Sequence, residues 1–382
     1  MVSSAVLASS NAVPEGYDGP RACRPLELAP TLDLINYVFR HLRTPPGRPT
    51  MGWDYPHVYN PANLDNVRIV ARNGEPVASV GIYPTRVRTP RGEIAVGGIG
   101  AVATHPNHRR LGLSTLCLED AHATMRAAGL HVGLLGTGIP DFYRKLGWEN
   151  AGRQWRFSLD RGNVSFLPDA NRLEVTDEWR PHAAALCALH NAEPLGAPRT
   201  DATFVLRAER KFVRLVVATR AGQPVAYAGL RDSTAAETAG APDNVAALLR
   251  AIFMSLDDPQ RRTTDRIPGQ TTRTELGVIT PVRPDGLPAL LTHRGVPHTL
   301  SYQGMLKILD APTLFAALNL SQVDLERIQL PSGRDGWRLH ANRTLDLSEP
   351  ALVKLCFGPE RFPNFAPELF PLPFFQCPAD RV

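Results

Sequence analysis

The sequence has 382 residues, of which 43% are hydrophobic, and this length is enough for two or three domains that each bury a core. Its formal net charge is +5, but no basic run is interleaved with aromatic residues, so we expect no nucleic-acid partner. No apolar run approaches the roughly 18 residues that a membrane-spanning helix needs, so we expect no membrane partner.

The N-terminal segment lacks a basic region before its brief apolar run, so it does not read as a signal peptide. We expect a disordered tail that ends near Gly19, and the cytoplasm as the default location. The five cysteines are odd in number and widely spaced, without a C-x-x-C pair or a histidine cluster. They predict buried thiols, and we expect neither a disulfide framework nor a metal site.

The first elements read as an amphipathic helix over residues 32–39 and a proline-rich loop over 44–50. A hairpin follows over 67–81, because Asn73 and Gly74 suit the two positive-φ positions of a type I′ turn. Pro90 to Gly92 then turns the chain into a buried strand over 94–104. Glycines at 97, 98 and 100 in this strand predict that another segment approaches its backbone closely.

After this strand, residues 109–114 read R-R-L-G-L-S and lead into a helix over 113–128, with Gly129 just beyond its end. Backbone N–H groups at such a helix N-terminus, together with the helix dipole, can hold a pyrophosphate. A side chain at Gly112 would then stand where the phosphates must come. By itself this motif is weak, and a simple strand-to-helix turn is the alternative.

About thirty residues on, a second strand over 130–136 is followed by P-D-F-Y-R-K-L-G-W at 140–148. This stretch predicts a short helix stopped by Gly147. The two motifs, in this order and at this separation, resemble those of the GCN5-related N-acetyltransferases (GNAT). Arg109, Gly112 and Ser114 fill the fixed positions of R/Q-x-x-G-x-G/A, although Ser114 replaces the usual Gly or Ala, and residues 142–148 match F-Y-x-K-L-G-F.

This resemblance implies an acyltransferase that uses acetyl-CoA as its co-substrate, without a metal. It implies that the backbone of two stretches binds the coenzyme. The first stretch, which also supplies an N–H donor to the thioester oxygen, is Val102, Ala103 and Thr104. The second is Arg109, Arg110, Leu111, Gly112, Leu113, Ser114 and Thr115. Tyr143 would give a proton to the departing thiolate. Residues 53–55 lie in the segment that lines the acceptor groove in such enzymes; a loop that caps the core is the alternative.

Residues 213–229 repeat the first hairpin, since G-x-P-V-A-x-x-G occurs at 74–81 and again at 222–229. With a helical pattern over 182–190 before it, this repeat predicts a second copy of the fold. We expect a polar loop over 232–243, a helix over 245–256, a loop over 257–275 and a strand over 276–282. No R-x-x-G-x-G/A precedes that helix, so this copy should not bind coenzyme A. It would instead form one side of the acceptor pocket or support an interface.

The last part alternates strands and short helices. We expect a strand over 302–309, a helix capped by Asp310 that runs to 318, and a helix over 351–357 that is capped by Ser348 and ended by Gly358. The whole predicts two GNAT-like mixed-sheet α+β domains, 1–155 and 156–298, and a small sterol-carrier-protein-like α/β domain, 299–382. This arrangement resembles the Eis-type acetyltransferases.

The Eis-type resemblance implies a small-molecule amine as acceptor, a symmetric homo-oligomer, most often a hexamer, and a terminal carboxylate that reaches the active site. The base would then be the carboxylate of Val382. Phe374 and Phe375 would anchor the tail by burial, so that residues 376–382 extend toward Tyr143. Two alternatives stay open: other acyl-CoA chemistry, such as O-acylation or decarboxylation, and a noncatalytic lipid- or ligand-binding protein.

Overall fold

The computed structural model describes residues 12–40, 50–212, 214–257, 275–359, 362 and 364–381. The described chain divides into two compact units: residues up to 84 together with 97–135, and residues 85–96 together with 136–381. No helix among the described residues is long and apolar enough to cross a membrane. All five cysteines are free and buried, as the sequence predicts.

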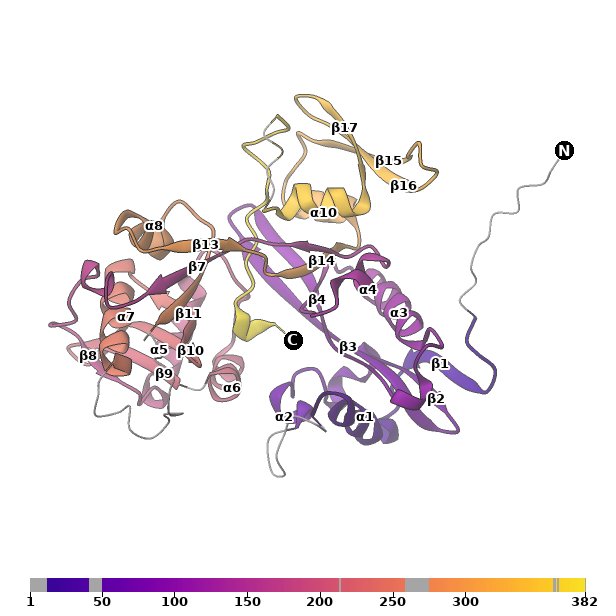
Figure 1. The fold of residues 1–382 in the computed structure, drawn as a ribbon, viewed down its shortest axis with the longest axis horizontal. Coiled ribbons are helices and arrows are strands. Elements are labelled where there is room, and N and C mark those ends of the chain that lie inside the picture. The colour runs from indigo at the N-terminus through magenta and orange to yellow at the C-terminus, as the bar shows by residue number, and fades with distance from the viewer. Residues whose placement is uncertain are drawn as a thin grey trace. The chain divides into compact units, whose positions relative to one another are not determined.

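The first unit is built on strands that lie side by side in chain order (Figure 1). They are β1 (Tyr17–Ala22), β2 (Val67–Arg72), β3 (Glu75–Thr89), β4 (Gly92–Thr104) and β5 (Val132–Leu135). The end of β3 and the start of β4, within residues 85–96, belong to the second unit. Helices α1 (Leu28–Arg40) and α2 (Met51–Asp54) connect β1 to β2, and α3 (Leu113–Ala127) connects β4 to β5. Gly97 is the close approach that the sequence predicts, because a Cβ there would collide with the Met125 sulfur of α3.

The predicted hairpin between β2 and β3 is confirmed. Asn73 has φ 52° and Gly74 has φ 84°, as a type I′ turn requires. The prediction of a disordered tail up to Gly19 is wrong from Tyr17 onward, because β1 pairs antiparallel with β2. An edge strand of this kind takes its backbone hydrogen bonds from a neighbour distant in the sequence, so its own residues carry little signal.

The second unit contains a seven-stranded sheet in the order β13-β7-β12-β11-β10-β9-β8. Its strands are β7 (Gln154–Leu159), β8 (Glu174–Thr176), β9 (Arg214–Arg220), β10 (Gln223–Arg231), β11 (Thr234–Gly240), β12 (Leu276–Pro281) and β13 (His298–Ser301). Helices α5 (Ala183–Ala192) and α6 (Asp201–Lys211) connect β8 to β9, while α7 (Pro242–Asp257) connects β11 to β12. Helix α8 (Gly286–His293) follows β12.

Two hydrophobic cores cover the two faces of this sheet. Along β9 the side chains alternate, with Val216 and Ala218 in the core under α7, and Leu215 and Val217 in the core under α5 and α6. The same alternation puts Tyr227 of β10 under α5 and α6. A central sheet buried on both faces follows from this pattern.

The second unit repeats the strand order and helix placement of the first. The β9–β10 turn again has two positive-φ residues, Ala221 at 49° and Gly222 at 72°. In both hairpins the register shifts at the valine of the shared motif, Val77 and Val225, which leaves this residue out of the pairing. The internal repeat predicted from G-x-P-V-A-x-x-G therefore forms the same local structure twice.

The polar loop expected over 232–243 is wrong, because residues 234–240 form the central strand β11. This strand pairs antiparallel with β10 and parallel with β12. Alanines favour strands weakly, but those at 235, 236 and 239 are buried on the two faces of the sheet, so tertiary packing outweighs local propensity. The loop expected over 257–275 lies outside the described residues from 258 to 274.

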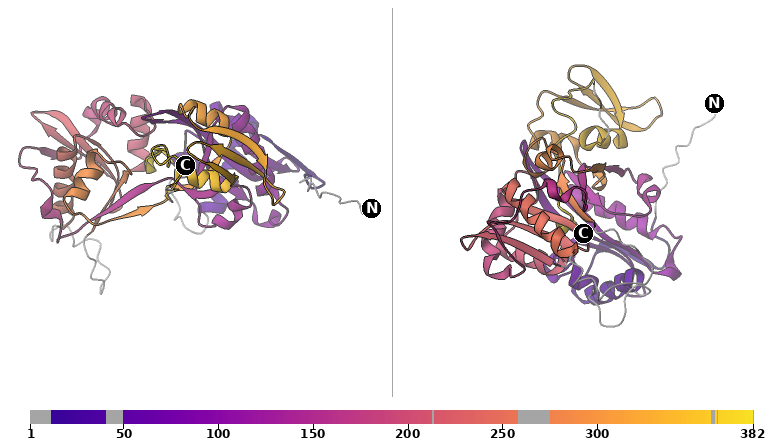
Figure 2. Two further views of the ribbon diagram at one scale, coloured as in Figure 1. Left: turned by 90° about the horizontal axis from the view of Figure 1, so that it is seen from above. Right: turned by 60° about the vertical axis from the view of Figure 1, so that its left-hand side comes forward.

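The last part of the second unit begins with β14 (Gly304–Ile308), which pairs antiparallel with β6 (Glu149–Ala151). Helix α9 (Ala311–Ala317) and helix α10 (Glu349–Phe357) begin at the predicted caps, since Asp310 and Ser348 accept the N–H groups of Thr313 and Ala351 at 3.0 and 3.4 Å. Helix α10 packs on a three-stranded antiparallel sheet (Figure 2). Its strands are β15 (Asp324–Gln329), β16 (Asp335–His340) and β17 (Thr344–Ser348).

Candidate active site

The turn between β4 and α3 shapes an exposed helix N-terminus in the first unit. Arg110 and Gly112 have left-handed backbones, with φ of 65° and 75°. Gly112 is the N-cap of α3, and no side chain among the described residues caps this end. The first backbone bond of the helix runs from the N–H of Leu116 to the carbonyl of Gly112 at 3.0 Å, so the N–H groups of residues 113–115 have no partner within the helix.

The charge around this turn is positive, because Arg109 and Arg110 are both exposed beside it. With the helix dipole, this makes the turn suitable for an anion. Gly112 is required here by its φ of 75°, which residues with a Cβ rarely adopt. A Cβ at this position would meet no protein atom within 4 Å, so no neighbouring side chain explains the glycine.

Ser114 has a structural role that explains its departure from Gly or Ala. Its hydroxyl lies 2.7 Å from the Thr104 hydroxyl, which joins the first turn of α3 to the end of β4. Leu113 and Ala103 are buried in the core. The side chains of these four residues therefore hold the turn in place, and what they can offer to a ligand is their backbone.

A distortion in β4 precedes the turn and was missed in the sequence. Ala101 has φ 45° in the middle of a strand, a conformation that a non-glycine residue rarely adopts. Tyr59 donates to the carbonyl of the preceding Gly100 at 3.4 Å. Such a break in a strand turns backbone groups away from ladder pairing, and the next N–H belongs to Val102, the first residue of the predicted oxyanion donor stretch. Alanine at 101 gives no sequence signal for it.

A group of aromatic side chains lies on the α1–α2 side of the first unit. The rings of His57 and Tyr83 are 4.4 Å apart in a T-shaped arrangement, and Tyr55 lies 6.1 Å from His57. Tyr55, Tyr83 and Ala101 pack against the same core cluster. Trp53 is 52% exposed. His57 and Tyr83 thus lie beside Tyr55, which belongs to the segment predicted to line an acceptor groove. Nothing in the sequence singled out His57 or Tyr83.

Tyr143 belongs to the second unit, where it lies in α4 (Pro140–Arg144). Its side chain is buried, and its ring meets that of Phe142 edge to face at 5.0 Å. Burial raises the pKa of the phenol above its ordinary value, against a smaller opposing effect of a hydrogen bond with Thr137. The phenol is therefore neutral at pH 7 and able to donate. The helix ends earlier than predicted, at Arg144, and Gly147 follows with φ 81°.

Val382 lies outside the described residues, so the extension of the tail toward Tyr143 stays a prediction. Phe374 and Phe375 are buried, as predicted. The burial continues beyond them, because Gln376, Cys377, Ala379 and Asp380 are each under 5% exposed. The second unit holds this segment through charged groups that the sequence places far apart.

The side chains of Glu237, Cys377 and Asp380 have ligand atoms close enough to one another to hold a metal ion. The guanidinium of Arg199 already lies between the two carboxylates, with its Nη2 2.6 Å from Glu237 and 2.9 Å from Asp380. A cation in this position neutralises the carboxylates and would repel a divalent ion. These residues do not fit a metal site.

A comparison with known families identifies the domain that contains the turn before α3. Residues 20–151 match the family model of an acetyltransferase (GNAT) domain. No curated protein matches the sequence. The chain therefore contains a GNAT acetyltransferase domain, and this domain covers the exposed start of α3.

Solved structures share the fold over most of the chain. A probable N-acyltransferase from Enterococcus faecalis has 13% identity and a TM-score of 0.59, with 88% of each chain covered. A GCN5-related N-acetyltransferase from Kribbella flavida has 17% identity and a TM-score of 0.55, over 86% of this chain and 82% of that one. Eis1 from Mycobacterium abscessus has 13% identity and a TM-score of 0.56, over 90% of both chains. At these identities the likeness shows the fold alone.

Proposed function

We propose that the protein is an acetyl-CoA-dependent N-acetyltransferase that acetylates a primary amine of a small molecule. The observation that carries this proposal is the start of α3, where two left-handed residues and an uncapped helix N-terminus lie beside two exposed arginines. This donor set fits a pyrophosphate. Bound acetyl-CoA would supply an acetyl group already activated as a thioester.

The chain's own residues would then bind, polarise and transfer protons. The N–H groups at positions 113–115 would donate to the pyrophosphate, and the N–H of Val102 beside the strand distortion would donate to the thioester oxygen as it gains charge. Tyr143 would donate its proton to the departing sulfur. An amine with an ordinary pKa near 10 must first lose a proton, and the carboxylate of Val382, ionised at neutral pH, would accept it.

The likeness to Eis1 over nearly the whole chain supports an Eis-type arrangement: two GNAT-like domains and a sterol-carrier-protein-like C-terminal domain. In this arrangement the second copy has no coenzyme turn. Eight residues separate β4 from α3 in the first copy, whereas Ala241 alone separates β11 from α7. We propose a cytoplasmic enzyme with one coenzyme site per chain.

Moving the terminal carboxylate tests the base. Appending four glycines after Val382 should lower kcat by roughly 100-fold and leave the acetyl-CoA KM unchanged, because proton acceptance is lost while the coenzyme site is intact. The control carries the same four residues at the N-terminus. If the C-terminal extension leaves kcat at the wild-type value, the base is a side chain or a water molecule, and His57→Gln is the next variant to measure.

We also propose a symmetric homo-oligomer, with a hexamer as the favoured state. The support is the Eis-type arrangement together with a second copy that needs no active site of its own. Light scattering at micromolar concentration should give a mass about six times that of the 41.8 kDa chain. A monomeric mass would contradict the proposal.

A further inference from the structure

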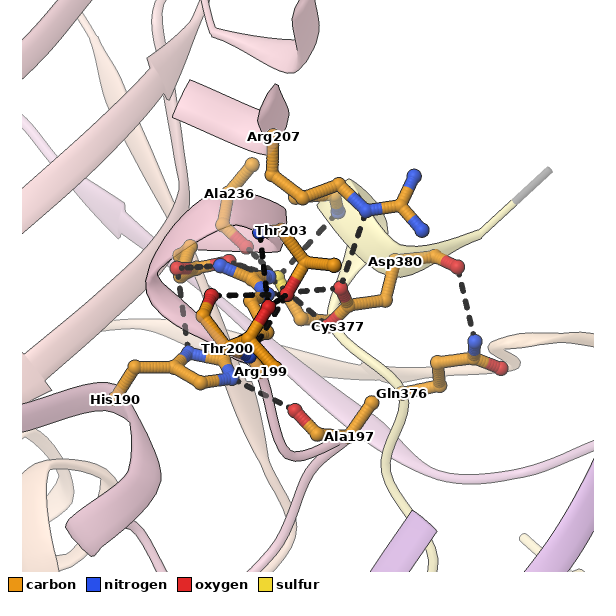
Figure 3. Close-up of polar contacts among 12 residues, drawn as sticks. His190, Ala197, Arg199, Thr200, Thr203, Arg207, Ala236, Gln376, Cys377 and Asp380 are labelled. Atoms are coloured by element: carbon orange, nitrogen blue, oxygen red, sulfur yellow. Dashed lines mark hydrogen bonds and ion pairs between the residues drawn. The ribbon is translucent and has the colours of Figure 1, made fainter. Parts of the chain in front are cut away.

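The second unit contains a buried cluster of charged side chains centred on Arg199 (Figure 3). Its guanidinium donates two parallel hydrogen bonds to Glu237, at 2.8 and 2.6 Å. Its Nε donates to Asp380 at 2.9 Å, and Arg207 lies 3.6 Å from the same carboxylate. All four side chains are at most 5% exposed, so the interactions are shielded from solvent.

Glu237 is ionised in this environment. Burial alone would raise the pKa of its carboxyl, but Arg199 beside it holds the pKa well below the ordinary value. Glu237 also accepts hydrogen bonds from the hydroxyl of Tyr227 at 2.5 Å and from the thiol of Cys377 at 2.9 Å. A carboxylate of the central strand β11 therefore binds the C-terminal segment both directly, through Cys377, and through Arg199.

The cluster lies on a particular face of the second sheet. Phe375, Cys377 and Ala379 belong to the core between this sheet and helices α5 and α6. In the first copy, the helices at the same place in the chain order are α1 and α2, and residues 53–55 at the end of α2 are predicted to line the acceptor groove. The C-terminal segment thus fills the face of the second copy that corresponds to the acceptor side of the first.

A second set of contacts holds the residue next to the terminus. Arg381 donates to the carbonyls of Gln376 and Gln303 and to the side chain of Gln154, each at 2.8 Å. Gln303 in turn donates to the carbonyl of Phe374 at 2.7 Å and accepts from the N–H of Gln376 at 2.9 Å. The segment is held at both ends, although it has no regular secondary structure apart from the turn Pro378–Asp380.

We propose that the second copy of the fold is a binding site for the chain's own C-terminal segment, residues 376–381, and that Arg199 and Asp380 are positioning residues that fix the alignment of this segment up to Arg381. Buried ion pairs add little net stability compared with apolar packing, but their directional bonds permit one alignment only. A C-terminal segment held by apolar contacts alone could shift its position along the core. The hydrogen bond between Asp380 and Arg199 prevents such a shift. The catalytic consequence rests on the proposed function, whereas the binding itself does not.

Asp380→Ala tests the binding, because it alters the segment and leaves the Arg199–Glu237 pair intact. The readout is alkylation of Cys377 in the native protein, followed by mass spectrometry. Release of the segment should make Cys377 react at least about tenfold faster, while the buried Cys117 of α3 and Cys356 of α10 stay protected. The control is Asp335→Ala, which removes a surface pair with Arg327 and should change none of the three rates.

Two results would overturn the binding role. Unchanged protection of Cys377 would show that Asp380 does not hold the segment, and equal exposure of all three thiols would show that the cluster only supports the fold. A separate measurement addresses positioning: Asp380→Ala should lower kcat at least about tenfold without changing the acetyl-CoA KM. If Asp380→Ala has the wild-type kcat although its Cys377 is reactive, the positioning role is refuted and the binding role stands. If the wild-type protein transfers no acetyl group, the proposed function fails, yet the thiol readout still decides the binding.

Discussion

Replacing Gly112 with valine is expected to raise the acetyl-CoA KM roughly 10- to 100-fold, which corresponds to the loss of one charge-assisted hydrogen bond worth about 1.5–3 kcal/mol. The backbone at this position has φ 75°, which valine adopts only with strain. The change would therefore redirect the first N–H groups of α3 and also place a side chain in the space in front of them. Initial-rate kinetics at varied acetyl-CoA would measure the effect.

Gly74→Val is the matched control. Gly74 lies in the same unit, has φ 84°, and would also place its Cβ in open space, but it belongs to the β2–β3 turn. Both variants carry the same backbone strain, so any common loss of stability is separated from the loss of coenzyme binding. Equal KM values for Gly112→Val and Gly74→Val would refute the assignment of the pyrophosphate site.

Replacing Tyr143 with phenylalanine is expected to lower kcat roughly 100-fold with little change in the acetyl-CoA KM. The substitution removes a proton donor and preserves the buried ring and its contact with Phe142. Because burial raises the pKa of this phenol, the wild-type donor stays protonated through neutral and mildly alkaline pH. The deficit of the variant should accordingly be constant between about pH 6 and 9.

Tyr302→Phe serves as the control for this variant, since it removes a phenol from a partly exposed position. Its kcat should equal that of the wild type. A kcat for Tyr143→Phe within twofold of the wild type would exclude Tyr143 as the proton donor and leave water in that role.

The sequence predicted those parts of the fold in which the signal is local. Asn73 and Gly74 specify a hairpin through their own backbone preferences, and Asp310 and Ser348 specify helix starts through hydrogen bonds that span three residues. The helix start at Gly112 falls in the same class. Each of these features depends on residues within one or two turns of chain, so a pattern in the sequence is sufficient to find it.

Features that depend on distant partners were missed. Strand β11 is rich in alanine and forms because β10 and β12 pair with it and because its faces are buried. The left-handed backbone falls on Ala101, whereas the neighbouring glycine, the residue type that usually adopts it, is at position 100. The burial of residues 376–380 depends on Arg199 and Glu237, which are 181 and 143 residues away from Asp380 in the sequence. No local pattern could indicate these contacts, because each partner is unremarkable on its own.

A titration of coenzyme A into the protein tests the central claim most directly, because it needs no knowledge of the acceptor. Isothermal calorimetry should show binding at one site per chain, with affinity lost in Gly112→Val and retained in Gly74→Val. One site per chain is expected because eight residues connect β4 to α3, whereas Ala241 alone connects β11 to α7. Absence of binding to the wild-type protein, or equal binding to the Gly112 variant, would contradict the account.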